Sequence, residues 1–195
     1  MSADTDRYTD KPIREYLNEL ASKSPVPGGG SAAALVGATG AACLTKAVSF
    51  TIGKENYKSV EGEMQGFLKD LEALQEDFMK LCSEDAAAYG KLSDTFKMPK
   101  SPERVGKIEG ALKEAMRVPL LICKNASRAL KLCPAVREKG NKNLASDVDC
   151  AVSMLRCAYQ SALLNVEINL KSIKDEEFVK ETRNALKEIG PLGCS

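Results

Sequence analysis

Apolar positions recur at helical spacing along nearly the whole chain. The clearest run comprises seven residues that follow one another at alternating intervals of four and three: Val60, Met64, Phe67, Leu71, Leu74, Phe78 and Leu81. Antiparallel helical bundles bury a seam of this kind. The pattern therefore predicts a long helix over about 60–96, and no clear alternation of β-branched and polar residues predicts a strand.

Five further helices are predicted from the same spacing and its interruptions. They cover about 13–22, 31–50, 103–132, 147–172 and 175–189. Prolines break helices, so Pro25 and Pro27 end the first of them, Pro119 predicts a kink or break in the helix over 103–132, and Pro134 ends or redirects it. Ser146 is the expected N-cap of the following helix.

These elements predict an all-α fold, a bundle of about six mostly antiparallel helices, formed by one domain over residues 1–195. The net charge of +1 gives no reason to expect a nucleic-acid or membrane partner. The segment from Gly28 to Thr45 has no charged residue and just reaches the length of a membrane span. Its side chains are small rather than strongly apolar, which favours a buried helix.

The chain contains no histidine, which excludes Ser-His-Asp and Cys-His catalysis within it and makes a zinc site improbable. We expect no metal. The seven cysteines show no CxxC spacing, and the first residues are polar rather than a signal peptide. We therefore expect a cytoplasmic protein with mostly buried, reduced thiols, and an exposed free thiol at Cys194.

Asp85 takes the next position of the heptad seam, where an apolar side chain is expected. Burying an unpaired carboxylate is unfavourable, so Asp85 should be paired, protonated or directed into a cleft. The alternative is that the seam has rotated by this point and leaves Asp85 at the surface.

A second candidate group lies on the helix over 147–172. Seven residues share a narrow arc of it: Asp147, Ala151, Met154, Ala158, Ala162, Asn165 and Asn169. Asp147 stands in the first turn, where the helix dipole favours a carboxylate. The polar residues at the two ends of this arc either face a ligand or have structural roles, as a first-turn acid and two amides that bind neighbouring helices.

Two glycine-containing turns, "PGGGS" and "GNKN", complete the candidate chemistry. Glycine lets the backbone approach a ligand, and the amides at a helix N-terminus bind anions or partial negative charge. Neither turn matches a dinucleotide or P-loop motif. They predict a cradle for a polar ligand.

Six motifs occur in an order that resembles a known family: "PVPGGGSAAALVGATGAA", "TIGKENY", "EDAAAYG", "MPKSPE", "KGNKNLASD" and "SALLNVEINL". The chain resembles the cyclodeaminase/cyclohydrolase family from about residue 10 to 190. This family comprises the C-terminal domain of formiminotransferase-cyclodeaminase and free-standing methenyltetrahydrofolate cyclohydrolases.

The resemblance implies an all-helical homodimer with a tetrahydrofolate derivative bound as substrate in a cleft between helices. One implied reaction closes 5-formiminotetrahydrofolate to 5,10-methenyltetrahydrofolate and releases ammonia. The other interconverts 5,10-methenyltetrahydrofolate and water with 10-formyltetrahydrofolate. Carried over by motif, Asp85 and Asp147 are the expected catalytic residues, for acid/base work or for stabilising the cationic carbon.

Nine further residues are expected to bind the substrate: Gly28, Gly29, Gly30, Ser31, Lys54, Lys100, Asn141, Asn143 and Asn165. The glycines and the serine would line the pterin or the reacting carbon. The asparagines would orient amide edges, and the lysines would meet the glutamate tail of the folate.

Two departures from the family pattern favour an alternative. Asp149 stands where the pattern has glycine, and Glu55 and Asn56 stand where lysines are frequent. The alternative is an inactive family member that serves as a folate-binding or helical interaction module. Whether Asp85 and Asp147 face one cleft with the PGGGS loop discriminates between the two readings.

Overall fold

Helices make up all the regular structure in the computed structural model, which describes residues 8–190. The six α-helices are α1 (Ile13–Leu20), α2 (Gly29–Ser49), α3 (Glu61–Lys97), α4 (Pro102–Lys139), α5 (Ala145–Leu170) and α6 (Glu176–Glu188). Three short 3-10 helices accompany them: Tyr8–Asp10, Glu55–Val60 and Lys142–Leu144. The all-α prediction is confirmed.

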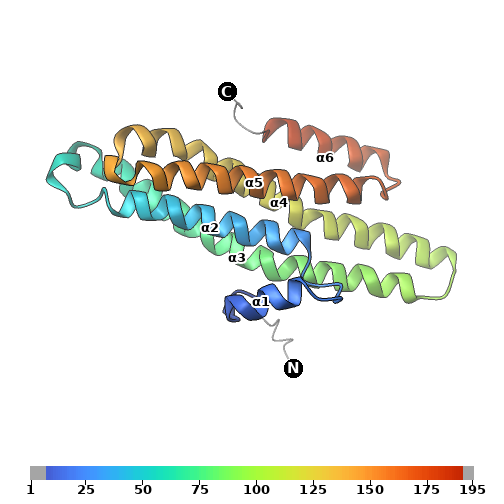
Figure 1. Cartoon of the computed structure of the whole chain (residues 1–195). Coiled ribbons are helices and arrows are strands. Elements are labelled where there is room, and N and C mark those ends of the chain that lie inside the picture. Colours follow the sequence, from blue (N-terminus) through green and yellow to red (C-terminus); the bar gives the residue numbers. More distant parts are fainter. Residues whose placement is uncertain (1–7, 191–195) are drawn as a thin grey trace.

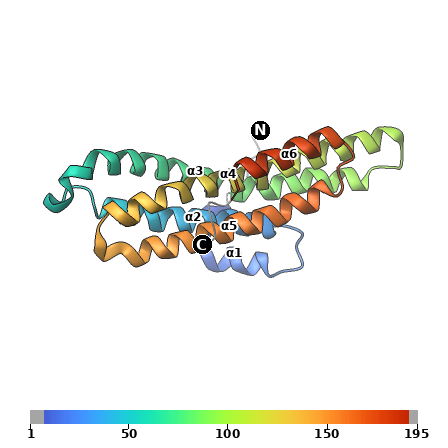
Figure 2. The same cartoon turned by 90° about the horizontal axis from the view of Figure 1, so that it is seen from above.

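Helices α2, α3, α4 and α5 form an up-and-down bundle in which each helix is antiparallel to its two neighbours (Figures 1 and 2). Helix α2 packs between α3 and α5, and α4 closes the bundle opposite α2. The α3–α4 hairpin extends well beyond the start of α2 (Figure 1). Helix α1 reaches the first turn of α2 through Tyr16, and α6 lies along α5 at the hairpin end (Figure 1).

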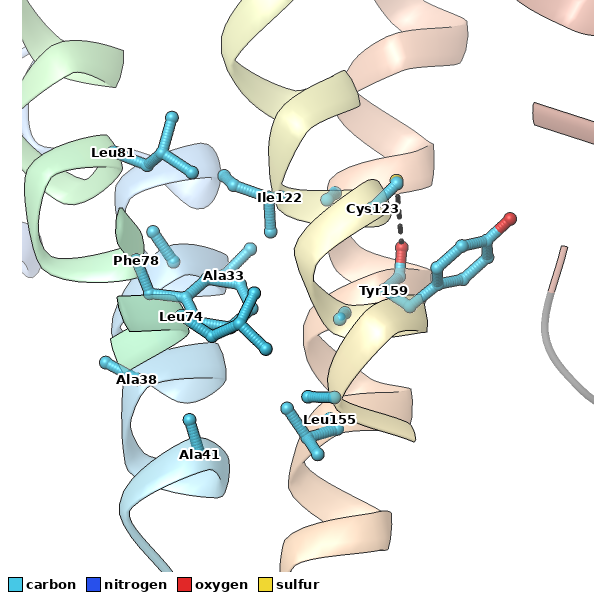
Figure 3. Close-up of a cluster of buried hydrophobic side chains, with 14 of the residues drawn as sticks. Ala33, Ala38, Ala41, Leu74, Phe78, Leu81, Ile122, Cys123, Leu155 and Tyr159 are labelled. Atoms are coloured by element: carbon cyan, nitrogen blue, oxygen red, sulfur yellow. Dashed lines mark hydrogen bonds between the residues drawn. The ribbon is translucent and has the colours of Figure 1, made fainter. Parts of the chain in front are cut away.

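Close helix packing explains why α2 consists largely of small residues. A Cβ atom added to Gly37 would lie 2.5 Å from the Phe78 ring of α3, and one added to Gly40 would lie 2.9 Å from Leu155 of α5. The core between these helices contains the α3 seam, with Leu74 and Phe78 fully buried (Figure 3). Both the seam and the small-residue face therefore pack as predicted.

Helix α2 is long and apolar enough to pass a composition test for a membrane span, and it is the only such helix among residues 8–190. More than half of its most apolar window is buried inside the bundle. The core helix of a bundle passes the same test, because a helix that is covered on two sides is apolar around most of its circumference.

The expected break in the fourth helix is wrong. Helix α4 runs without interruption from Pro102 to Lys139 and contains both Pro119 and Pro134. Each proline removes one helical hydrogen bond, but packing of α4 against α3 and α5 outweighs that loss. The N-cap prediction is also wrong: Leu144 is the N-cap of α5 and Ser146 lies inside the first turn, because the preceding 3-10 helix leads directly into α5.

The prediction of mostly buried cysteines holds for three of them and fails for two. Cys82, Cys123 and Cys133 are buried, Cys43 is half-buried, and Cys150 and Cys157 are exposed on α5; all six are free thiols. Burial raises the pKa of Cys123 and of Cys133 to about 12. Cys194 lies outside the described residues.

Candidate active site

A pocket of about 230 Å³ lies where the PGGG loop meets the middle of the α3–α4 hairpin and the C-terminal half of α5. Six glycine or polar residues line it: Gly28 to Gly30 from the loop and the start of α2, Asp85 from α3, and Asn165 and Asn169 from α5. Tyr89, Leu92, Pro119 and Ile168 add apolar surface. The pocket thus brings together five of the predicted site residues: Gly28, Gly29, Gly30, Asp85 and Asn165.

Asp85 is the one carboxylate among the described residues that line this pocket. Its Oδ2 accepts a hydrogen bond of 2.9 Å from the backbone N–H of Ser31, in the first turn of α2. Burial raises the pKa of the Asp85 carboxyl above its usual range, and the Ser31 hydrogen bond lowers it in part. The seam position therefore directs Asp85 into a cleft, where a carboxyl group can give up or accept a proton closer to neutral pH.

Gly30 permits this arrangement because it has no side chain. A Cβ atom at this position would lie 2.6 Å from Cγ of Asp85, closer than real Cβ atoms approach. Gly29 is different: a Cβ there would lie 3.7 Å from Nδ2 of Asn165, an ordinary contact. Of the glycine run, Gly30 is the position at which close approach of another residue requires glycine.

Two polar side chains of α5, Asn165 and Asn169, also line the pocket. Asn165 donates from Nδ2 to the carbonyl of Ser161, one turn earlier, at 2.8 Å. That bond fixes the orientation of the amide and leaves the Asn165 carbonyl oxygen as an acceptor toward the pocket. Three members of the predicted α5 arc lie beside α2: Asn165 near Gly29, Met154 near Gly40, and Asp147 paired with Lys46.

Asp147 lies at the other end of α2. Its carboxylate pairs with the Lys46 ammonium at 2.7 Å, and both side chains are partly exposed. Gly30 and Lys46 are sixteen residues apart on α2, about 24 Å at 1.5 Å per residue. Within one chain, Asp85 and Asp147 therefore do not face the same cleft, and the shared cleft that would favour an enzyme over an inactive member is not found in a single chain.

The "GNKN" residues build the turn at this second end. Asn141 is buried and donates from Nδ2 to the Phe50 carbonyl at 3.0 Å, while its Oδ1 caps the N–H of Asn143. Its amide is thus engaged in joining the turn to the end of α2. Asn143 is exposed, and so is Lys54, whose ammonium lies 5.8 Å from the centre of the Phe50 ring.

The remaining predicted residues lie away from the pocket. Lys100 is exposed in the turn between α3 and α4, at the tip of the hairpin. Asp149 is exposed on α5, where both its carboxylate oxygens pair with Arg137 of α4 at 2.9 and 3.2 Å. The departure at Asp149 therefore leaves the Asp85 pocket unchanged.

Sequence reasoning missed two contributors. Tyr89 lies one turn after Asp85 on the same seam, so its spacing was a usable signal. Lys46 carries no motif that singles it out from other surface lysines, and only its pairing with Asp147 draws attention to it. Among residues 8–190, no group of three or more His, Cys, Asp or Glu side chains is placed to hold a metal ion.

Comparisons with known proteins identify the family of this chain. The family model described as formiminotransferase-cyclodeaminase matches residues 12–188. A methenyltetrahydrofolate cyclohydrolase from Methylorubrum extorquens is 37% identical, with 92% of this chain and 91% of that protein covered. The formimidoyltransferase-cyclodeaminase of Rattus norvegicus is 29% identical, and this chain spans about a third of it, 34%.

The fold has been seen before in a related protein. The crystal structure of a formiminotetrahydrofolate cyclodeaminase from Thermotoga maritima matches with a TM-score of 0.87 and 31% sequence identity, covering 93% of this chain and 89% of that one. The match over nearly the full helical bundle and the family model over residues 12–188 confirm the resemblance expected from the motifs. The chain belongs to the formiminotransferase-cyclodeaminase family.

Proposed function

We propose that this protein is a folate one-carbon enzyme, either a formiminotetrahydrofolate cyclodeaminase or a methenyltetrahydrofolate cyclohydrolase. The observation that carries the proposal is Asp85, a carboxyl of raised pKa set into a pocket beneath the first turn of α2. The names of the relatives supply the substrate class: a cyclohydrolase at 37% identity and a cyclodeaminase at 31%.

Both reactions suit a carboxyl group of this kind. In the cyclodeaminase reaction, N10 bonds to the formimino carbon and loses its proton, and the bond from that carbon to the departing imino nitrogen breaks. This nitrogen takes up two protons, one equivalent to that lost by N10 and one from solvent, and leaves as ammonia. In the cyclohydrolase reaction, water adds to the methenyl carbon and loses its two protons; N5 takes up one as its bond to that carbon breaks, and the other goes to solvent. Asp85 would move the proton in each case, and its negative form would stabilise the cationic carbon.

The other pocket residues would bind the substrate. Gly28 and Gly29 leave the loop backbone open to a flat ring, and the Ser31 N–H holds the catalytic carboxylate in place. The free carbonyl oxygen of Asn165 would accept from an N–H on the edge of the pterin. A metal-free reaction remains a prediction.

The pocket volume supports the homodimer that the resemblance implies. At about 230 Å³ it is smaller than the roughly 300–1,000 Å³ typical of small-molecule sites, so part of a folate would stay outside it. We therefore expect a second copy to complete the site.

The solvent side of α2 is a suitable surface for that second copy. Seven residues, each partly or fully exposed, repeat along it at intervals of three and four: Gly29, Ala32, Val36, Thr39, Cys43, Lys46 and Phe50. This spacing is that of a second heptad seam, and helix α1 borders it at a pocket that Thr39 lines together with Ile13 and Tyr16. The seam is centred on Thr39, so pairing two α2 helices in opposite directions would set one copy's Lys46–Asp147 pair beside the partner's glycine loop. Asp147, Asn143 and Lys54 of one copy would then act on a substrate bound in the partner's pocket.

The first experiment offers the purified protein 5-formiminotetrahydrofolate and 5,10-methenyltetrahydrofolate side by side, followed by methenyltetrahydrofolate absorbance and ammonia release. Asp85→Asn should lower turnover at least a hundredfold. Asp94→Asn is the matched control, because Asp94 is an exposed carboxylate on the same helix that pairs only with Lys97. Full turnover in Asp85→Asn would overturn the proposal.

A second measurement tests the dimer. Light scattering at micromolar concentration should give twice the chain mass, and Thr39→Arg, at the centre of the exposed α2 seam, should give a monomer of much lower activity. A monomeric wild-type protein with full activity would contradict the dimer.

The alternative of an inactive member predicts folate binding without conversion of either substrate. Isothermal titration with a reduced folate, beside the two activity assays, separates it from the enzyme. We also propose a cytoplasmic location, which the six free thiols among residues 8–190 support.

A further inference from the structure

Tyr16 is the one buried side chain of helix α1. The helix otherwise lies at the periphery and leaves Ile13 76% and Leu17 52% exposed. The Tyr16 side chain instead points inward, and its hydroxyl donates to Oγ of Ser31 at 3.4 Å. A short surface helix is thus anchored at the first turn of α2, directly behind the candidate active site.

Ser31 contacts α3 through three hydrogen-bonding distances. Its hydroxyl donates to the carbonyl oxygen of Cys82 at 2.8 Å and lies 3.1 Å from the Cys82 Sγ, and its backbone N–H donates to Asp85 at 2.9 Å. Cys82 and Asp85 are one helical turn apart on α3. Ser31 therefore fixes the start of α2 against the same turn of α3 that presents the Asp85 carboxylate.

We propose that Tyr16 is a positioning residue for Asp85, acting through the Ser31 hydroxyl. A serine hydroxyl has a single hydrogen, and Ser31 gives it to Cys82; the Tyr16 hydroxyl occupies an acceptor site of the same oxygen and restricts its rotation. Tyr16 is absent from the residues that line the pocket, so it does not touch the substrate there. The inference rests on the proposed role of Asp85.

The tyrosine keeps its proton over the working pH range. Burial raises the pKa of Tyr16 to about 12, so the hydroxyl remains a donor in any ordinary assay. The titratable groups around Asp85 are Cys82 on α3, Tyr16 on α1 and Tyr89 in the pocket wall; α2, α4 and α5 contribute none to that wall. Asp85 is therefore the group expected to set the acidic limb of the activity profile.

The test compares Tyr16→Phe with Tyr159→Phe. Both tyrosines are 3% exposed, but Tyr159 lies on α5 beside Cys123 in another part of the core (Figure 3). Tyr16→Phe should lower kcat about tenfold with KM changed less than about twofold. Its acidic limb should move to higher pH, because a loosened Ser31 N–H bond no longer favours the charged form of Asp85. Tyr159→Phe should leave kcat, KM and the pH profile as in the wild type.

A double-mutant cycle checks the route of the effect. If Tyr16 acts through Ser31, then Tyr16→Phe combined with Ser31→Ala should be no less active than Ser31→Ala alone. Additive losses would overturn the proposed route, and a pH profile of Tyr16→Phe identical to that of Tyr159→Phe would overturn the positioning role.

If Tyr16→Phe does not fold, the pH profile of Ser31→Ala decides: an unmoved acidic limb contradicts the inference. Loss of activity in Asp85→Asn with none of these shifts would refute this inference alone and leave the proposed function standing.

Discussion

Replacing Gly30 with alanine tests how the first turn of α2 holds Asp85. The added Cβ would lie 2.6 Å from Cγ and 2.8 Å from Oδ2 of Asp85, so the carboxylate must move. Its hydrogen bond from the Ser31 N–H, 2.9 Å long, would then lengthen or break. The substitution therefore acts on the position of the Asp85 carboxylate rather than on the core.

The size of the effect follows from two opposing contributions. Alanine in a helix is favoured over glycine by at most about 1 kcal/mol. Loss of a hydrogen bond to a charged group destabilises by about 1.5–3 kcal/mol. The net loss of about 0.5–2 kcal/mol corresponds to a drop in Tm of roughly 1–8 °C for a chain of this size. Turnover should fall about a hundredfold or more, because Asp85 no longer sits where proton transfer requires it.

Gly66→Ala is the matched control, because Gly66 is an exposed helical glycine of α3 outside the pocket lining. Its Cβ would meet none of the described residues within 4 Å. We expect an unchanged or slightly raised Tm and activity within about threefold of wild type. Both variants are measured by thermal unfolding followed by circular dichroism and by methenyltetrahydrofolate absorbance. Wild-type turnover with a raised Tm in Gly30→Ala would refute the reasoning, because it would mean that Asp85 needs neither the position nor the hydrogen bond.

Three further predictions concern single side chains. Asp149→Gly should keep turnover within about twofold while lowering stability by about 1 kcal/mol, since it removes the pairing with Arg137 and places glycine inside a helix; a gain in activity would show that Asp149 obstructs the site. Tyr89→Ala should raise KM about tenfold because its ring lines the pocket, whereas Phe96→Ala, a similarly exposed aromatic on the same helix, should not; equal effects on KM would contradict a contact with substrate. Burial raises the pKa of Asp85 in the folded state above the value of 3.8 that the unfolded chain has, so the free energy of unfolding should fall as pH rises from 3.8 through the raised pKa. Urea titrations should find this decline in the wild type and not in Asp85→Asn. A decline of the same size in both proteins would show that Asp85 is not its source.

Much of the fold was accessible from spacing alone. The α3 seam marked a long buried helix, and the small residues of α2 marked close packing, since Gly37 and Gly40 leave no room for a side chain beside Phe78 and Leu155. Helix boundaries that depend on a single residue were predicted less well. Pro119 is a strong local signal against a helix, yet α4 continues through it because packing on two sides stabilises the helix by more than the lost hydrogen bond.

The candidate site, like the fold, could be predicted only in part. An aspartate at a seam position must find a polar partner or a cleft, so the sequence alone identified Asp85, and the glycine run identified the loop that faces it. Sequence motifs also placed Asp147 in the site, because a motif shows which residues occur together and not where they lie. Asp147 is at the far end of α2, paired with Lys46.

The sequence by itself determined the helices, the family and the chemical types available for catalysis, because periodicity and residue inventory are local properties. The tertiary structure decided which of these types meet. Ser31 lies fifty-four residues from Asp85 and fifteen from Tyr16, and only the packing of α1 and α3 against the first turn of α2 brings the three together. The length of α2 separates Asp85 from Asp147, because a helix is rigid and holds residues at its two ends apart.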